Sequence, residues 1–209
     1  RQYTSRYGGT SVPVLVINDK AFTDSQDILH YLDTIASDQQ LYPQDPELRQ
    51  QVETLEALFD DKLGVATRNW AYYYAIQQPW SILAAWSKGI SLMEKVKSAI
   101  AFPVATKIIK QKYNLTVEGK EAAVQDIREV FDIVNQKVNL GQKYLLGDRF
   151  SATDITFAAL ASLAIRPEHH PFYDSRLAKL PTEMVALVEE LRATPAGELV
   201  MRMYREHRQ

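Results

Sequence analysis

A short apolar strand followed by a helix with a polar start constrains the fold of this chain most. The segment Ser11-Val12-Pro13-Val14-Leu15-Val16 is apolar and carries a proline near its beginning. Proline cannot donate a hydrogen bond to a sheet, so it belongs at the first residues of a strand or at an edge. An X-Pro bond can also be cis at modest cost. From Thr23 to Leu32, acids and hydroxyls precede apolar residues at helical spacing, which predicts the start of a helix.

The rest of the sequence predicts a small mixed part followed by helices. We expect a strand at 12–17, a turn at 18–20, a partner strand at 20–23 and a helix at 24–35. Residues 37–46 are polar, contain two prolines and predict a linker. Beyond it, apolar residues recur at helical spacing, with interruptions near Gly64 and at Pro79. The apolar positions that define these helices are Val52, Leu55, Leu58, Phe59, Leu63 and Ala66; Ala123, Ile127, Val130, Phe131, Val134 and Val138; Met184, Leu187, Val188 and Leu191; and Leu199, Val200, Met203 and Tyr204.

Composition excludes several classes of function. The formal net charge of −2 gives no electrostatic case for a nucleic-acid partner. The chain contains no cysteine, which excludes disulfides, thiolate metal sites and a cysteine nucleophile within it. The sequence shows no secretory signal and no apolar run long enough to cross a bilayer, so we expect a cytoplasmic protein with no membrane partner.

The polar start of the first helix has two interpretations. Asp24 can accept an ammonium group by a charge-assisted hydrogen bond, and Ser25 can offer its hydroxyl and N–H to a carboxylate at the positive end of the helix. Such a receptor suits a peptide-like ligand that carries both an amine and a carboxylate. The alternative is an ordinary helix cap, for which the same residue types are favoured.

A second helix start lies in Tyr144-Leu145-Leu146-Gly147-Asp148-Arg149-Phe150-Ser151-Ala152-Thr153-Asp154-Ile155. Ser151 and Asp154 have the spacing of a capping box, and Phe150 and Ile155 that of a hydrophobic staple. We assign this motif a folding role and no catalytic role. On that basis Asp154→Ala is expected to cost about 1 kcal/mol of stability.

The Val-Pro strand followed by Asp-Ser at a helix start resembles the glutathione S-transferase family. The string from Tyr144 to Leu160 is similar to the buried capping motif of that family's helical domain. The resemblance extends to the C-terminal segment and so covers nearly the whole chain. It implies an α+β protein: a truncated thioredoxin-like α/β domain over residues 1–40, its C-terminal half only, and an all-helical C-terminal domain over residues 41–209.

The resemblance also implies a binding site for glutathione as co-substrate. Val12, through its backbone before Pro13, would contact the cysteinyl part, and Asp24 and Ser25 would hold the γ-glutamyl end. Arg6 could reach the glycine carboxylate, although a surface arginine is an equal alternative. The residue that activates the thiol has no counterpart here, because the family places it in a first β-α-β segment. We therefore expect that segment, and the catalytic group, upstream of Arg1, either missing from this sequence or lost in a shortened relative.

Aromatic residues near the middle of the chain offer a candidate acceptor pocket. Trp70, Tyr73 and Tyr74 could line an apolar site for a small hydrophobic electrophile, but core packing explains such residues equally simply. Asp60 and Asp61 suggest an additional acid near the γ-glutamyl amine, with a solvated helix face as the alternative. His169 and His170 are adjacent, lack an acid at ligand spacing and predict no metal site.

Two classes of function follow from the resemblance. The first is a glutathione transferase that adds glutathione to an electrophile or uses it to reduce a peroxide or disulfide, as a homodimer. The second is a non-catalytic binding or scaffold protein on the same fold. A redox protein with its own thiol would require a cysteine outside this sequence.

Overall fold

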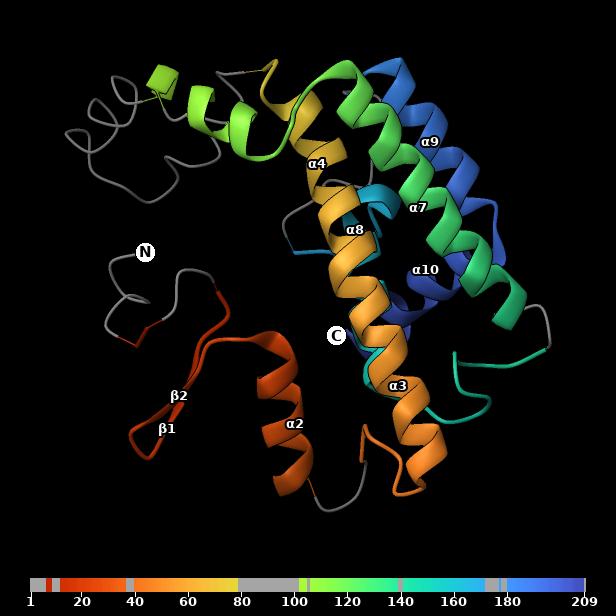
Figure 1. Cartoon of the computed structure of the whole chain (residues 1–209). Coiled ribbons are helices and arrows are strands. Elements are labelled where there is room, and N and C mark those ends of the chain that lie inside the picture. The colour runs from red at the N-terminus through yellow and green to blue at the C-terminus, as the bar shows by residue number, and fades with distance from the viewer. Residues whose placement is uncertain are drawn as a thin grey trace.

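The computed structural model describes residues 7–8, 12–36, 40–78, 102–104, 106–138, 141–171, 177 and 180–208. A β-hairpin, β1 (Leu15–Ile17) and β2 (Lys20–Phe22), and the helix α2 (Ser25–Ile35) precede a bundle of helices (Figure 1). The bundle contains α3 (Pro46–Leu58), the π-helix η1 (Phe59–Leu63), α4 (Gly64–Ala75), α7 (Val117–Val138), α8 (Ala152–Ile165), α9 (Thr182–Arg192) and α10 (Pro195–His207). The expected α+β organisation is confirmed. The boundary between residues 40 and 41 stays a prediction.

The hairpin is antiparallel, with Leu15 opposite Phe22 and Ile17 opposite Lys20. Asn18 and Asp19 have φ values of 46° and 66°, which is the conformation of a tight hairpin turn. The first strand is shorter than the predicted 12–17, because only residues from Leu15 onward pair with β2. The peptide bond between Val12 and Pro13 is cis.

Helix α2 begins where the sequence predicts and lies against the hairpin on one side. Asp24 is its N-cap and accepts a hydrogen bond from the Gln26 N–H at 2.9 Å. The Tyr31 ring packs on Phe22, with ring centroids 4.7 Å apart. No residue of α2 is fully buried, and Ile35 is 60% exposed. This part of the chain therefore rests on few apolar contacts.

Helices α3 and α4 form one continuous helical run with a π-helical turn between them. Asp45 caps α3 and accepts hydrogen bonds from Glu47 and Leu48, with Pro46 at the first helical position. The predicted apolar stripe faces the core. The helix does not break near Gly64, which instead begins α4 and lies so close to Leu160 that a Cβ would sit 3.0 Å from its Cδ2. The sequence pattern did not predict the π-helical turn at 59–63.

The core lies around α8, which contacts α3, η1, α4, α9 and α10. This helix is apolar on nearly all sides, as expected for a helix enclosed by others. Rings of Phe59 and Phe131 pack on Phe157 with centroids 5.2 and 5.4 Å away. The predicted helices at the C-terminal end are confirmed as α9 and α10. No helix in the described ranges is long and apolar enough to span a membrane.

Candidate functional site

The start of α2 presents the two predicted ligand-binding side chains to solvent. Asp24 and Ser25 are both exposed. One carboxylate oxygen of Asp24 accepts from Gln26, so the capping interpretation is confirmed, and the second oxygen remains available for a ligand. Within the described part of the chain, no hydrogen bond engages the Ser25 hydroxyl. A cap and a ligand receptor are thus compatible at this helix end.

The Val12–Pro13 segment precedes β1 of the hairpin, whose second strand β2 leads to this helix. Val12 is 79% exposed, and its backbone is not paired with β2. Arg6, the predicted partner of the glycine carboxylate, falls outside the described residues. The contacts assigned to Val12, Pro13 and Arg6 stay predictions.

The structure brings an acid of the helical bundle towards Asp24. Asp60, in the π-helix η1, has a raised pKa because burial penalises its charged form and because the negative charges of Asp24 and Asp61 lie nearby. The Asp24 carboxylate at the start of α2 is therefore near enough to Asp60 for its charge to raise the pKa of Asp60. A π-helical turn often occurs at functional sites, and here it carries Asp60. Asp60 and Asp61 are both exposed, so a solvated helix face stays the alternative for either residue, and a role near the γ-glutamyl amine stays a prediction.

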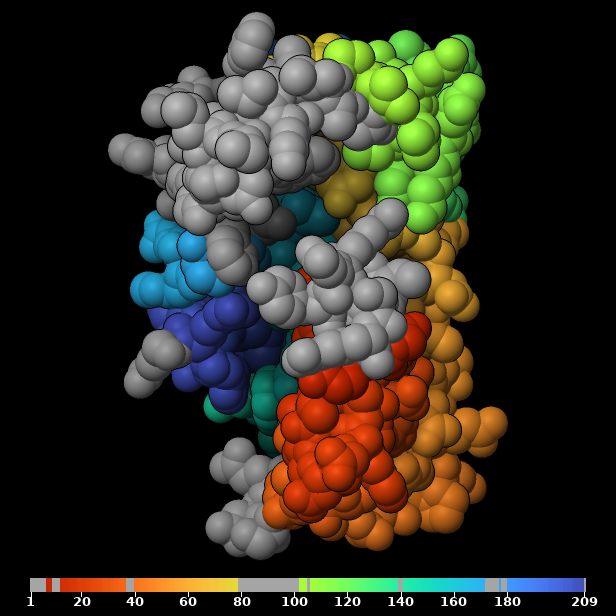
Figure 2. Space-filling view, turned by 90° about the vertical axis from the view of Figure 1, so that its left-hand side faces the viewer, coloured from red at the N-terminus to blue at the C-terminus, as the bar shows by residue number. Residues whose placement is uncertain are grey.

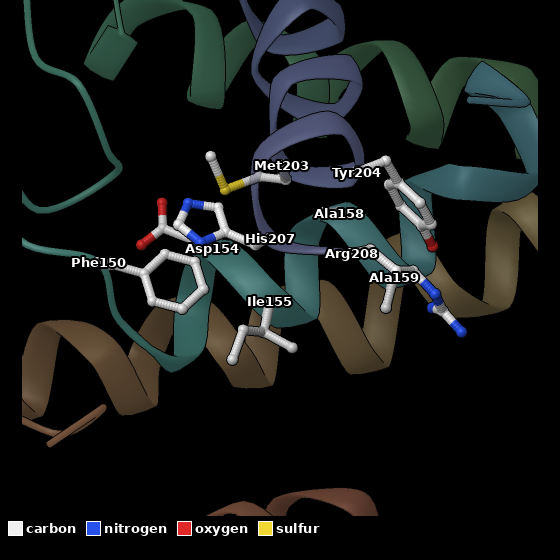
Figure 3. A pocket seen from close by; sticks show the side chains of 9 residues that line it. All are labelled: Phe150, Asp154, Ile155, Ala158, Ala159, Met203, Tyr204, His207 and Arg208. Carbon is white, nitrogen blue, oxygen red and sulfur yellow. The ribbon is translucent and has the colours of Figure 1, made fainter. Parts of the chain in front are cut away.

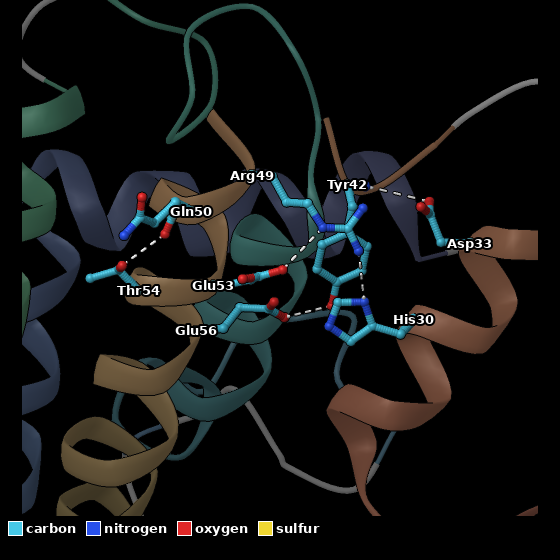
Figure 4. Close-up of polar contacts among 8 residues, drawn as sticks. All are labelled: His30, Asp33, Tyr42, Arg49, Gln50, Glu53, Thr54 and Glu56. Carbon is cyan, nitrogen blue, oxygen red and sulfur yellow. Dashed lines mark hydrogen bonds and ion pairs between the residues drawn. The ribbon is translucent and has the colours of Figure 1, made fainter. Parts of the chain in front are cut away.

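A polar network holds α2 against the beginning of α3 (Figure 4). The His30 ring stacks on Tyr42 with centroids 4.0 Å apart and an interplanar angle of 17°. Arg49 reaches both, with its guanidinium 5.4 Å from the Tyr42 ring centre and 3.5 Å from His30 Nδ1. Asp33 accepts hydrogen bonds from the backbone of Leu41 and Tyr42. These contacts fix the orientation of the helix whose first turn carries Asp24 and Ser25.

Glu56 is a buried carboxylate at the centre of this interface. Its side chain is 1% exposed, and its Oε1 accepts hydrogen bonds from the Tyr42 hydroxyl at 3.2 Å and the Thr156 hydroxyl at 3.0 Å. Its Oε2 is buried without a partner in the described structure. Burial raises the pKa of Glu56, against the opposing effect of the two hydroxyls and of His30. Sequence reasoning missed this residue, although its position four residues after Val52 places it on the buried stripe.

The aromatic residues proposed for an acceptor pocket lie mainly in the core. Trp70 is 1% exposed and packs edge-on against Tyr74. The Tyr74 hydroxyl donates to Glu183 at 2.7 Å, which ties α4 to α9. Core packing therefore accounts for Trp70 and Tyr74, and Tyr73 is only partly buried against the same cluster. A contact of any of the three with an electrophile stays a prediction.

A cavity of about 370 Å³ lies elsewhere, between α8 and α10 (Figure 3). Phe150 and Ile155, the predicted staple residues, both line it, and Phe150 stacks on His207 with ring centroids 4.4 Å apart. The His207 ring also meets the Tyr144 hydroxyl at 3.3 Å. Sequence reasoning did not identify this cavity, because its walls come from segments about fifty residues apart.

The capping motif at the start of α8 is present. The carboxylate of Asp154 is fully buried and accepts hydrogen bonds from the Ser151 N–H, the Ser151 hydroxyl and the Leu145 N–H, each at 2.9 Å. Burial raises the pKa of Asp154, and the hydrogen bonds act in the opposite direction. The motif therefore joins the 144–150 turn to α8 in addition to capping the helix. Among the described residues, no group of histidines and acids could hold a metal.

Comparison with known proteins finds a family match at the N-terminal end of the chain and solved structures with a similar fold. Residues 1–40 match the model of the glutathione S-transferase N-terminal domain. The crystal structure of the beta-etherase LigF from Sphingobium sp. strain SYK-6 is similar over 96% of this chain and 82% of that chain, with 21% identity and a TM-score of 0.56. The crystal structure of a glutathione S-transferase from Methylobacterium radiotolerans JCM 2831, in complex with glutathione sulfonate, is similar over 90% of this chain and 70% of that chain. The identity is 16% and the TM-score 0.47. No curated protein matches the sequence.

The matched N-terminal region contains Val12, Pro13, Asp24 and Ser25, so the family model covers the same residues from which the site was built. The likeness to the beta-etherase concerns the fold of the whole chain, including the helical bundle. The family match is therefore to the N-terminal domain at residues 1–40, and the likeness to the beta-etherase shows that the whole chain shares the fold of that structure.

Proposed function

We propose that this chain binds glutathione at the start of α2 and belongs to a glutathione transferase type of enzyme. The observation that carries the proposal is the exposed Asp24–Ser25 pair at the N-terminus of a helix, within the residues that match the family model. The free carboxylate oxygen of Asp24 suits the γ-glutamyl ammonium, and the Ser25 hydroxyl and the helix N-terminus suit the carboxylate beside it.

Asp60 extends this proposal across to the helical bundle. A second carboxylate near Asp24 increases the negative potential where the ammonium would lie. A bound ammonium would relieve the repulsion between the two acids, so glutathione binding should lower the pKa of Asp60. Asp60, the second acid near the γ-glutamyl amine, would then come from the same chain as Asp24.

In the reaction, the glutathione thiolate attacks an electrophilic carbon, a C–S bond forms and the leaving group departs with its electron pair. A peroxide or a disulfide would instead accept the sulfur nucleophile at oxygen or sulfur. Asp24 and Ser25 are proposed to hold glutathione, and assays with each class of acceptor identify the reaction. Beta-ethers belong among the compounds to be assayed, because the fold neighbour is a beta-etherase.

The direct test is calorimetric titration of the chain with glutathione. Ser25→Ala should weaken binding by roughly 1.5–3 kcal/mol, or about tenfold to hundredfold, because a hydrogen bond to a charged group is lost. Thr34→Ala is the matched control, since it removes a hydroxyl near the other end of α2. Equal affinities for the wild type and Ser25→Ala, with the fold intact, would refute this site.

The second candidate is a binding or scaffold protein without catalysis. The feature that favours it is that the polar side chains at the start of α2, Asp24 and Ser25, suit the charged groups of a ligand rather than its thiol. Turnover assays with chlorodinitrobenzene, an organic hydroperoxide, a disulfide and a beta-ether separate the two. Glutathione binding without turnover on any of them would select the scaffold function.

A further inference from the structure

The positive charge of this chain is concentrated in one region. Residues 64–117 carry a net charge of +6, whereas the remainder carries −8. The near-zero sum for the whole chain therefore conceals a strong asymmetry. The cationic residues of this region are Arg68, Lys88, Lys95, Lys97, Lys107, Lys110 and Lys112, and its one acid is Glu94.

Within this region, the described residues 102–104 and 106–113 combine exposed lysines with exposed aliphatic side chains. Val104 is 65% exposed and Ile108 is 58% exposed, and the lysines at 107, 110 and 112 are exposed as well. In the helical stretch 106–112, Lys112 lies one turn after Ile108 on the same side. Figure 1 shows this stretch at the end of the molecule opposite the tip of the hairpin, and Figure 2 shows it as a continuous surface there.

This surface is fixed to the helical bundle. The Tyr113 ring meets Tyr72 of α4 edge-on, with centroids 5.4 Å apart, and the Arg68 guanidinium lies 5.3 Å from the centre of the Tyr113 ring. Thr116 then caps α7 by accepting from the Gly119 N–H at 3.0 Å. The C-terminal end of the 106–112 stretch, which carries Lys112, is therefore anchored to the bundle.

We propose that the surface formed by Val104, Lys107, Ile108, Lys110 and Lys112 binds the face of a membrane that contains anionic lipids. Exposed aliphatic side chains enter the boundary between headgroups and acyl chains, and lysine ammonium groups pair with lipid phosphates while their stems lie along the apolar surface. This binding is peripheral and requires no spanning helix. It departs from the expectation of no membrane partner, which relied on the absence of an apolar run long enough to cross a bilayer.

A nucleic acid is the competing polyanion, and the side chains favour the lipid. Base recognition and single-strand binding use aromatic stacking and arginine, neither of which a valine and an isoleucine can replace. Two exposed aliphatic residues among lysines have a use at a lipid surface and none on a phosphate backbone. The proposal is independent of glutathione binding, because the start of α2 takes no part in it.

The test is co-sedimentation of the full chain with phosphatidylcholine vesicles, with and without phosphatidylglycerol. We expect binding to the anionic vesicles only, and loss of it as salt is raised from roughly 0.05 M to 0.5 M, where charges are screened within a few ångströms. The variant with Lys107→Gln, Lys110→Gln and Lys112→Gln should bind about a hundredfold more weakly, since each lysine near an anionic surface contributes roughly fivefold. The variant with Val104→Ser and Ile108→Ser should weaken binding at every salt concentration.

The matched control replaces three cations elsewhere, Lys20→Gln, Lys137→Gln and Lys143→Gln, and should retain binding. Circular dichroism confirms that each variant is folded. The proposal is overturned by equal partition onto neutral vesicles, by no partition, or by an equal loss in the control variant. It is also overturned if an RNA oligonucleotide binds through the same three lysines while anionic vesicles do not.

Discussion

Two aspartates at helix starts, Asp24 and Asp154, illustrate how burial separates a binding residue from a folding residue. Asp24 is exposed and uses one oxygen for a single cap hydrogen bond. Asp154 is fully buried and satisfies three donors from two segments. The same side chain at the same kind of position therefore leaves one carboxylate open to a ligand and commits the other to the fold.

Asp154→Ala is expected to destabilise the protein by about 2–4 kcal/mol, because it leaves buried N–H groups of Leu145 and Ser151 unpaired. This exceeds the roughly 1 kcal/mol expected from the sequence, because that figure applies to an ordinary cap and does not include the burial of Asp154. Urea unfolding measures the difference, with Asp24→Ala as the exposed-cap control at about 1 kcal/mol or less. Equal costs for the two variants would contradict the role of burial.

At the scale of elements, the contact of α2 with α3 depends on a buried acid. Glu56 accepts from Tyr42 of the linker and Thr156 of α8, and His30 of α2, Arg49 of α3 and Asp60 of η1 lie around it. These groups link the neighbouring segments from α2 to η1 with α8, which is distant from them in sequence. The charge state of Glu56 should therefore influence how firmly α2 is held.

The raised pKa of Glu56 predicts a specific pH dependence of stability. The folded protein holds this proton more tightly than the unfolded chain, so the stabilisation is complete below the unfolded pKa and is lost as pH rises through the folded pKa. From about pH 4.5, the ordinary value, upward, the free energy of unfolding of the wild type should fall relative to that of Glu56→Gln. Urea unfolding over a pH series measures this gap, with exposed Glu53→Gln as the control. A gap that does not change with pH would argue against a buried proton on Glu56.

At the scale of the whole molecule, the two parts of the chain differ in the amount of buried surface. Helix α2 has no fully buried residue, whereas α8 buries nine of its fourteen. Local opening requires less free energy where fewer apolar contacts are lost. Helix α2, which carries the candidate binding site at its start, is therefore expected to open more readily than α8.

Amide hydrogen exchange should show this difference directly. The amides of α2 should exchange at a markedly lower opening free energy than those of α8, because opening α2 exposes little buried apolar surface. Glutathione should slow exchange in the first turn of α2 and leave α8 unchanged. Uniform protection of both helices without ligand would show that α2 is held more firmly than its burial indicates.

The sequence by itself determined the features that arise within a few residues. The Asn18–Asp19 turn, the Asp24 cap, the apolar stripe from Val52 to Ala66 and the Ser151–Asp154 capping box depend on local conformation and periodicity. Together with the Val12–Pro13 strand they led to the family and to its expected ligand contacts.

Only the tertiary structure decided which of these residues meet. The approach of Asp60 to Asp24, the burial of Glu56 beneath Tyr42, the core position of Trp70 and the cavity lined by Phe150 and His207 depend on contacts between segments that are far apart in sequence. Periodicity gives the direction in which a side chain points from its own helix, but the neighbour it meets, and hence its burial and its charge state, follows from how the helices pack.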